Sequence, residues 1–208
     1  MEQRNLFSPG TTDIAPRADL LACLAAATRR PEACVMGRGG GIPSAVLVPL
    51  VDHVPGFTIL LTRRAGHLAS HRGQVCFPGG RVEAHDDGPV ATALRETFEE
   101  VGLPSAAVTV IGCLDDYATL TGFMITPVVG VIAPPLLLRI APEEVETAFE
   151  MPLSFLLDPA HHHRLTPVHS RIVRTTYAIP WQGHYVWGAT AAMLMNLYRI
   201  IGRMRTER

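Results

Sequence analysis

The feature that most constrains the fold of this 208-residue chain is an acidic segment that directly follows a glycine turn. The segment Arg95–Leu103 reads R-E-T-F-E-E-V-G-L. On a helix of 3.6 residues per turn, its three carboxylates share one stripe: Glu96, Glu99 and Glu100. The opposite stripe is apolar and contains Ala91, Leu94, Phe98 and Val101. We therefore expect a helix over Pro89–Val101 with an apolar core face and a carboxylate face, ended by Gly102 as a left-handed cap.

Three carboxylates this close together repel one another, so the helix needs a positively charged partner. Like charges at i and i+4 destabilise an isolated helix by a few tenths of a kcal/mol per pair. Magnesium or manganese would offset the repulsion, because these cations take carboxylate oxygens and Mg²⁺ keeps positions open for water and phosphate. The alternative is a solvated acidic surface. The preceding stretch Phe77–Asp87, F-P-G-G-R-V-E-A-H-D-D, favours the metal site, because its glycines let backbone approach a ligand closely.

The rest of the chain mixes strand-like and helix-like segments. Apolar runs predict strands over Ser44–Val51, Phe57–Thr62, Val108–Leu114, Ile125–Ile132 and Ile172–Ile179. Further helices are predicted over Ala18–Thr28, Glu143–Phe149 and Val186–Arg205. Because no strict β-α-β repeat is present, we expect an α/β fold with a mixed sheet and helices on both faces. We assign an N-terminal arm and helix to residues 1–37 and one main domain to residues 38–208.

Composition excludes several classes of partner and compartment. The formal net charge of −1 gives no basic excess for a nucleic-acid backbone. The N-terminus lacks a signal-peptide pattern, and the most apolar run, Val128–Leu138, is too short to span a bilayer. The cysteines are scattered at Cys23, Cys34, Cys76 and Cys113. We therefore expect reduced thiols without a disulfide or zinc site, in a cytoplasmic protein that binds neither nucleic acid nor membrane.

The acidic segment resembles the second half of the Nudix box, G-x5-E-x7-R-E-U-x-E-E-x-G-U, where U is aliphatic. The matching residues are Arg95, Glu96, Glu99, Glu100, Gly102 and Leu103, with Thr97 at the first U position. The first half departs from the pattern. Counted back from Arg95, Asp87 holds the acid position and Arg81 the glycine position. Gly80 lies one residue further away, so the loop carries one extra residue.

This longer loop resembles the coenzyme A pyrophosphatase branch of the family, and so does an upstream signature. The signature has the form L-L-T-x-R-S-x-x-L-R-x-H-x-G-Q-V-x-F-P-G-G. Residues Leu60–Gly80 read L-L-T-R-R-A-G-H-L-A-S-H-R-G-Q-V-C-F-P-G-G, with Ala65 in place of the serine and Ala69 in place of the arginine. Segments 121–130, 143–153 and 186–191 also resemble the branch, so the likeness covers roughly residues 40–195.

The resemblance implies a Nudix-type α/β/α sandwich and a hydrolase that uses Mg²⁺ or Mn²⁺. The implied metal ligands are Glu96, Glu100 and Glu99, the last of which would otherwise orient water. Arg95 would orient a neighbouring carboxylate through charge-assisted hydrogen bonds. Backbone around Gly79 and Gly80 would complete the metal shell and contact substrate. The general base stays open between Glu99, Glu144 and Glu150.

Coenzyme A would be cut at its pyrophosphate into 3′,5′-ADP and 4′-phosphopantetheine. Its extra 3′-phosphate calls for cations, and the candidates are Arg63, Arg64, His67, His71 and Arg72, of which Arg64 and His71 rank first. We interpret His161–His163 as an exposed loop rather than a metal site, and Trp181 and Trp187 as packing residues rather than adenine platforms.

Two other functions stay open. The chain could hydrolyse another nucleoside diphosphate derivative, such as ADP-ribose or NADH, a reading favoured by Ala69. It could also be a non-catalytic ligand sensor with the same fold, although such a sensor would be expected to lose glutamates that this chain keeps. A homodimer is suggested by the resemblance alone.

Overall fold

A mixed β-sheet forms the centre of the molecule in the computed structural model, which describes residues 16–35, 40–165 and 176–206. Its strands are β1 (Ile42–Asp52), β2 (Phe57–Arg64), β3 (Val75–Cys76), β4 (Gly79–Arg81), β5 (Val108–Cys113), β6 (Tyr117–Ala118), β7 (Phe123–Ile132) and β8 (Val145–Pro152). The main order is β3-β2-β1-β7-β5, with β4 on β1, β6 on β7 and β8 on β2. Strands β1 and β7 are parallel and the other pairs are antiparallel.

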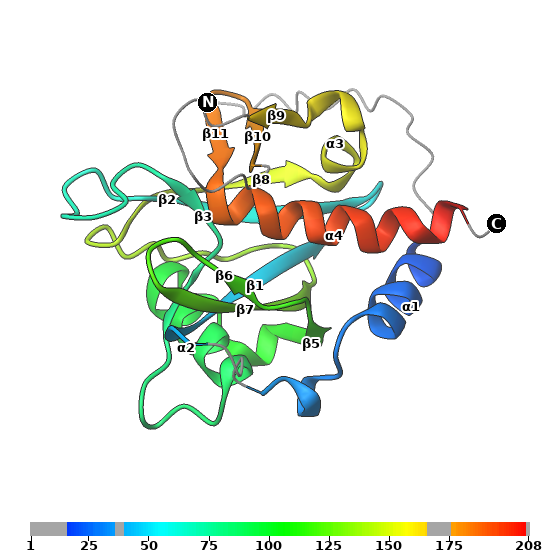
Figure 1. Ribbon diagram of the computed structural model, residues 1–208. Coiled ribbons are helices and arrows are strands. Elements are labelled where there is room, and N and C mark those ends of the chain that lie inside the picture. The colour runs from blue at the N-terminus through cyan, green and yellow to red at the C-terminus, as the bar shows by residue number, and fades with distance from the viewer. Residues whose placement is uncertain (1–15, 36–39, 166–175, 207–208) are drawn as a thin grey trace.

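Helices cover both faces of this sheet (Figure 1). Helix α2 (Pro89–Val101) packs on β1 and β4, and α4 (Gly188–Thr206) crosses the other face beside α1 (Arg17–Ala27). A small sheet in the order β11-β10-β9 lies with α4, and α3 (Leu153–Leu157) follows β8. The strands of the small sheet are β9 (His163–Leu165), β10 (Thr176–Trp181) and β11 (His184–Trp187). Short 3₁₀ turns occupy Pro31–Ala33, Ser105–Ala107 and Pro159–His161. The predicted α/β/α sandwich with a mixed sheet is confirmed.

The alternation of side chains along β1 builds two cores. Ala45 and Leu47 join the cluster under α2, whereas Val46 and Val48 join the cluster under α4. A strand that is buried on both faces is mostly apolar, which explains why the sequence of β1 is a nearly continuous apolar run and was predicted as a strand. Leu20 and Leu24 of α1 are fully buried in the α4 cluster, so the N-terminal helix shares the core of the domain.

Most of the predicted elements are present, and one is wrong. The helix predicted over Glu143–Phe149 is instead strand β8, which pairs along β2 with Phe149 opposite Leu61. The edge of β2 satisfies the backbone of this segment, and such pairing overrides a local helical preference. The predicted final helix begins at Gly188, because Val186 and Trp187 pair with β10. Residues 172–175 of the predicted Ile172–Ile179 strand lie outside the described residues, and the remainder begins β10.

Two of the four cysteines are bonded to each other, so the prediction of reduced thiols throughout is wrong. A disulfide joins Cys34 to Cys113, whereas Cys23 and Cys76 are free. The backbones of Arg29 and Cys113 exchange hydrogen bonds of 2.8 and 2.9 Å, which brings the segment after α1 onto β5. Because 79 positions separate the two cysteines, only the tertiary fold reveals the pairing.

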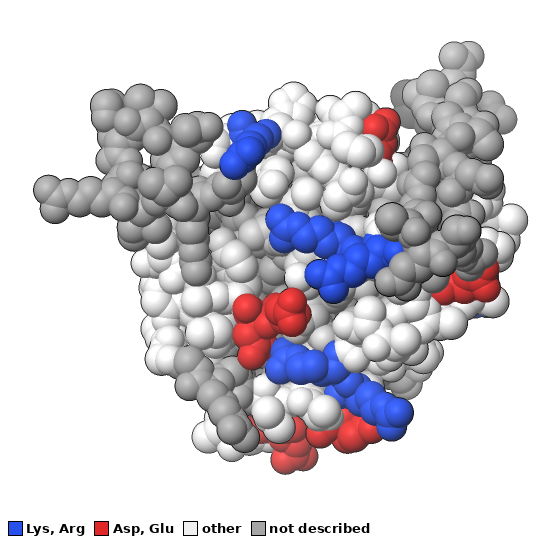
Figure 2. Space-filling model, turned by 45° about the vertical axis from the view of Figure 1, so that its right-hand side comes forward, with Lys and Arg blue, Asp and Glu red and all other residues white. Residues whose placement is uncertain are grey.

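The surface charge is mixed. Figure 2 shows a face on which acidic side chains lie between basic ones. Within the described residues, no helix is both long and apolar enough to cross a membrane.

Candidate functional site

The glycine turn lets the sheet approach the acidic helix. A Cβ atom on Gly80 would lie 2.3 Å from Oε1 of Glu96, and one on Gly79 would lie 2.4 Å from the carbonyl oxygen of Ala45. A side chain at Gly79 would collide with the backbone of β1, and one at Gly80 would displace the carboxylate of Glu96. The Pro-Gly-Gly sequence therefore places backbone of β4 directly against a carboxylate of α2, as the sequence predicted for a strand–loop–helix site.

Helix α2 is rotated relative to the predicted face. The buried residues are Pro89, Thr92, Ala93, Thr97, Glu100 and Val101, whereas Phe98 is 57% exposed and Ala91 and Leu94 are half-buried. The buried threonines satisfy their hydroxyls within the helix, since Thr97 Oγ1 donates to the Ala93 carbonyl at 2.6 Å. Small residues let the helix pack closely on β1 and β4. The prediction of Phe98 as a core residue is wrong, and part of the carboxylate stripe faces inward.

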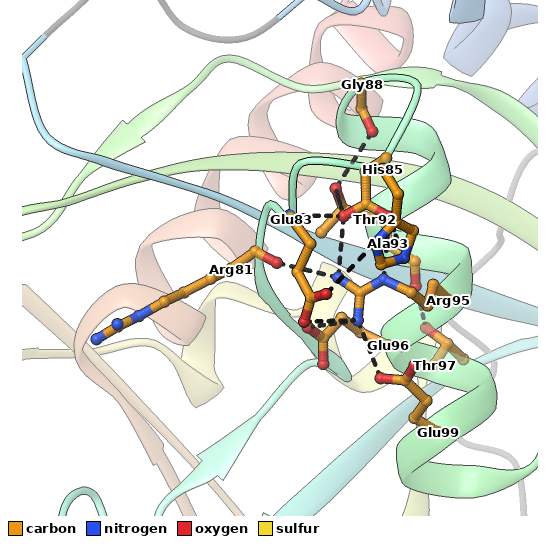
Figure 3. A network of polar contacts seen from close by, with 11 residues as sticks. Arg81, Glu83, His85, Gly88, Thr92, Ala93, Arg95, Glu96, Thr97 and Glu99 are labelled. Carbon is orange, nitrogen blue, oxygen red and sulfur yellow. Dashed lines mark hydrogen bonds and ion pairs between the residues drawn. The ribbon is translucent and has the colours of Figure 1, made fainter.

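Arg95 organises the carboxylates of this helix (Figure 3). Its Nε and Nη2 donate to the two oxygens of Asp86 at 3.0 and 2.9 Å. Its Nη1 donates to Glu96 Oε1 and to Glu99 Oε2, each at 3.0 Å, and Nη2 also donates to the Arg81 carbonyl at 3.1 Å. A fork of five donors fixed in this way holds the two glutamates at set positions.

Asp86 is the residue that the sequence analysis missed. It accepts hydrogen bonds from Arg95, from the backbone N–H of Glu83 and from the Thr92 hydroxyl. These bonds, with the Arg95 bond foremost, hold the pKa of the Asp86 carboxyl well below its usual range, although burial opposes the shift.

The acid position of the box therefore belongs to Asp86, and the assignment of Asp87 is wrong. Asp87 is exposed. Counted forward from Gly80, the pattern G-x5-acid reaches Asp86, so the extra residue lies between Asp86 and Arg95. A count back from Arg95 places the extra residue between Gly80 and the acid, which is wrong. A count forward from Gly80 would have identified Asp86 from the sequence.

Glu100 is buried, and Glu96, one turn before it on α2, is half-buried. Glu100 is only 2% exposed, and its Oε2 has no hydrogen-bond partner within the described part of the chain. Burial is the main cause that raises the pKa of Glu100 to about 8, and the charges of Glu144 and Glu96 add to it. The charge of Arg64 opposes this rise. Burial likewise raises the pKa of Glu96. Burial thus outweighs the compensation that Arg95 gives Glu96 and Arg64 gives Glu100, as expected of a site that takes a cation.

The donor set fits a hard divalent cation with few protein ligands. Across residues 16–35, 40–165 and 176–206, no three His, Cys, Asp or Glu side chains are arranged to hold a metal ion. Glu99 is half-exposed and hydrogen-bonded to Arg95, whereas Glu100 is buried and its Oε2 is unpaired within the described residues. Mg²⁺ needs only one or two carboxylates, because water and substrate phosphate complete its octahedron. Glu96, Glu100 and the backbone at Gly80 suit that requirement.

The predicted phosphate-binding cations are not all in one place. Successive side chains of β2 point to opposite faces. The charge of Arg64 acts on Glu100, and its buried Nε has no partner among the described residues. Arg63 lies 3.5 Å from Glu146, and its charge lowers the pKa of His184 after the larger effect of burial. Of the two arginines at the end of β2, Arg64 is thus the one whose charge acts on Glu100.

The remaining candidates lie on the exposed loop between β2 and β3. His67, His71 and Arg72 are exposed, and His71 Nδ1 lies 3.0 Å from Gln74 Oε1. Within the histidine triplet, rings of His161 and His162 contact the carbonyls of Phe155 and Leu156 at 3.0 and 2.7 Å. These two rings are partly buried, so the prediction of an exposed loop is wrong for them. Trp181 packs on Phe155, whereas Trp187 is 45% exposed.

Comparison with known proteins adds an independent finding. The profile of the NUDIX domain matches residues 42–173. An uncharacterized Nudix hydrolase, NudL, from Salmonella paratyphi B is 46% identical over 160 residues, which cover 76% of this chain and 82% of that protein. NudL from Salmonella enteritidis matches to the same extent. A MutT/nudix family protein from Enterococcus faecalis has a similar fold, with a TM-score of 0.52 and 16% identity, over 91% of this chain and 70% of that one.

Proposed function

This chain belongs to the Nudix family and is a Nudix hydrolase, and on this premise we propose that it hydrolyses the pyrophosphate bond of coenzyme A or its derivatives. The products would be 3′,5′-ADP and 4′-phosphopantetheine. The signature in Leu60–Gly80 supports the choice of substrate. The main support for a hydrolytic site is the buried Glu100. One oxygen of its carboxylate has no hydrogen-bond partner within the described residues, and the charge of Arg64 acts on this carboxylate.

Each residue of the site has a distinct task in the proposed reaction. Nudix hydrolases generally use Mg²⁺ or Mn²⁺, and Glu96 and Glu100 would hold that cation here. When bound, the cation supplies positive charge beside the diphosphate and makes a bound water more acidic. Arg95 keeps Glu96 and Glu99 in position through its two 3.0 Å hydrogen bonds. Arg64, whose charge acts on Glu100, would help to neutralise a substrate phosphate.

A substrate panel with product identification by mass tests this proposal. Coenzyme A, ADP-ribose and NADH are incubated with the protein and Mg²⁺ or Mn²⁺, and kcat/KM is measured for each. We expect coenzyme A to be the best substrate and to yield 3′,5′-ADP. Equal or faster hydrolysis of ADP-ribose would instead favour the second candidate, for which Ala69 is the specific observation, because it replaces the arginine of the signature.

A ligand sensor of the same fold is the third possibility, and Glu100→Gln separates it from an enzyme. Glutamine preserves the shape of the side chain but cannot carry the charge that a cation needs. We expect turnover to be lost while the fold is kept, as followed by circular dichroism. A cytoplasmic location, a homodimer and the boundary between residues 1–37 and 38–208 stay predictions.

A further inference from the structure

Arg81 directly follows the glycine turn, and its main chain is fixed by the residues of the site. It is the last residue of β4 and pairs with Ser44 of β1. Its carbonyl accepts a hydrogen bond from Nη2 of Arg95 at 3.1 Å. The same guanidinium of Arg95 holds Glu96 and Glu99. The main chain of Arg81 therefore has a set position relative to the carboxylates of α2.

The side chain of Arg81 points away from these carboxylates. Successive residues of a strand point to opposite faces, and a Cβ atom on Gly80 would point at Glu96. Arg81 therefore projects from the other face of β4. Figure 3 shows its side chain extending away from Arg95 and Glu96. Within the described residues, β4 pairs only with β1, so its outer edge lies open between the carboxylates on one side and the guanidinium of Arg81 on the other.

An aromatic ring supports this guanidinium. Cζ of Arg81 lies 5.3 Å from the centre of the Phe123 ring, within the range of a cation–π contact. The pairing of the strands explains the contact. Ile42 and Ser44 share one face of β1, and Ile42 pairs with Phe123 as Ser44 pairs with Arg81. Arg81 and Phe123 therefore project from the same face of the sheet.

The turn before β7 holds Phe123 in place. The N–H of Thr119 donates to the Phe123 carbonyl at 2.8 Å, and the N–H of Phe123 donates to the Thr119 hydroxyl at 2.9 Å. The N–H of Ile42 donates to the Gly122 carbonyl at 2.7 Å, which joins this turn to β1. The ring is thus a fixed support on which the longer side chain of Arg81 rests.

The positive charge of Arg81 has no partner among the described residues. The side chain is exposed, and within that part of the chain it forms neither an ion pair nor a side-chain hydrogen bond. Arg63, by contrast, lies 3.5 Å from Glu146, and Arg29 lies 2.6 Å from Asp116. A guanidinium is a planar fork of donors that matches a phosphate group. Arg81 thus offers such a fork next to the glycine turn.

We propose that Arg81, supported by Phe123, binds a phosphate group on the ribose of the substrate, which in coenzyme A is the 3′-phosphate; this inference rests on the proposed hydrolysis of coenzyme A. The diphosphate would lie at Glu96 and Glu100, and the ribose would cross the open edge of β4 toward Arg81. ADP-ribose and NADH carry no phosphate beyond their diphosphate. Arg81 would therefore select for substrates with the additional phosphate.

Coenzyme A and 3′-dephospho-coenzyme A differ only in that phosphate, so kcat/KM for the two substrates tests the role. For the wild type we expect kcat/KM to be about tenfold or more higher with coenzyme A, because one charge-assisted hydrogen bond contributes at least that much. In Arg81→Gln the two values should lie within twofold of each other. The loss should be confined largely to coenzyme A and should appear in KM rather than in kcat.

Three further variants separate recognition of the phosphate from a structural effect. Arg81→Lys keeps the charge but not the planar fork, so it should keep part of the preference. Phe123→Leu removes the aromatic support and should reduce the preference without abolishing it. Arg30→Gln replaces an exposed arginine after α1 and should keep the full preference. An Arg81→Gln variant that keeps a tenfold preference, or that loses activity equally on both substrates, would overturn the role.

Nucleotide binding tests Arg81 without any turnover, and so distinguishes this role from the proposed function. In calorimetric titrations, we expect the wild type to bind 3′,5′-ADP about tenfold more tightly than 5′-AMP, and Arg81→Gln to bind both equally. A wild type that shows this preference but cleaves no coenzyme A would contradict the proposed function and support the phosphate site. Equal affinity of the wild type for the two nucleotides would overturn the phosphate site, whether or not coenzyme A is cleaved.

Discussion

Arg95 can position its neighbours because Asp86 binds it through two parallel hydrogen bonds. A bidentate carboxylate restrains the plane of the guanidinium, which leaves Nη1 directed at Glu96 and Glu99. Asp86 itself is nearly buried, with 3% of its side chain exposed. The ion pair of Asp86 and Arg95 is thus largely covered from solvent, and it holds Glu96 and Glu99 in position through the hydrogen bonds of Arg95.

Replacement of Asp86 should therefore affect both stability and catalysis. We expect Asp86→Asn to lower the free energy of unfolding at pH 7 by about 2–4 kcal/mol, because it removes the charged, bidentate partner of the half-buried Arg95. The pKa of Asp86 is depressed in the fold, so its stabilisation exists above about pH 4 and is lost as the pH falls further. The difference between variant and wild type should shrink accordingly in acid.

Urea unfolding at pH 7 and below pH 4 measures this difference, and Asp87→Asn is the matched control. Asp87 is exposed, so its replacement should change stability by less than about 0.5 kcal/mol. Equal effects of the two variants would show that the acid position of the box is wrongly placed at Asp86.

At the scale of elements, local pattern was enough for some features and not for others. Strands β1, β2, β5 and β7 and helix α2 were predicted because their apolar periodicity is strong. Strand β8 was missed, since its pairing with β2 is not encoded locally. The rotation of α2 was missed because a hydrophobic pattern does not reveal that threonines can be buried with their hydroxyls bonded inside the helix. The site depends on that rotation, which turns Glu100 inward.

Two alanine substitutions test the orientation of α2. Val101→Ala removes a fully buried side chain and should destabilise the protein by about 2 kcal/mol. Phe98→Ala removes a larger side chain that is mostly exposed, so we expect less than about 1 kcal/mol. Thermal unfolding of both variants gives the comparison. A larger loss of stability for Phe98→Ala than for Val101→Ala would show that Phe98 faces the core, as predicted from the sequence.

At the scale of the whole molecule, the N-terminal segment is tied to the domain in two ways. Helix α1 contributes buried leucines to the core under α4, and the segment after it is bonded to β5 through Cys34 and Cys113. Neither tie could be predicted from sequence, because both join residues far apart in the chain. The residues of the proposed metal site could be predicted from sequence, since they lie close together within one strand–loop–helix unit.

A count of thiols tests the covalent tie. Protein unfolded without reductant should show two reactive thiols, from Cys23 and Cys76, and four after reduction. Cys34→Ser should show three without reductant. Removal of the bond should also lower the free energy of unfolding by about 2–4 kcal/mol. Four thiols in the unreduced wild type would contradict the pairing.

The central claim is that Glu96 and Glu100 hold a divalent cation against a diphosphate, and calorimetric titration of metal-free protein with Mn²⁺ tests it most directly. Because the pKa of Glu100 is raised to about 8, that carboxyl is mostly protonated at pH 7 and must lose its proton to bind. The account predicts saturable binding to the wild type, with proton release at pH 7 that declines above pH 8, and little binding to Glu100→Gln. Absence of Mn²⁺ and Mg²⁺ binding to the wild type, with and without coenzyme A, would contradict it.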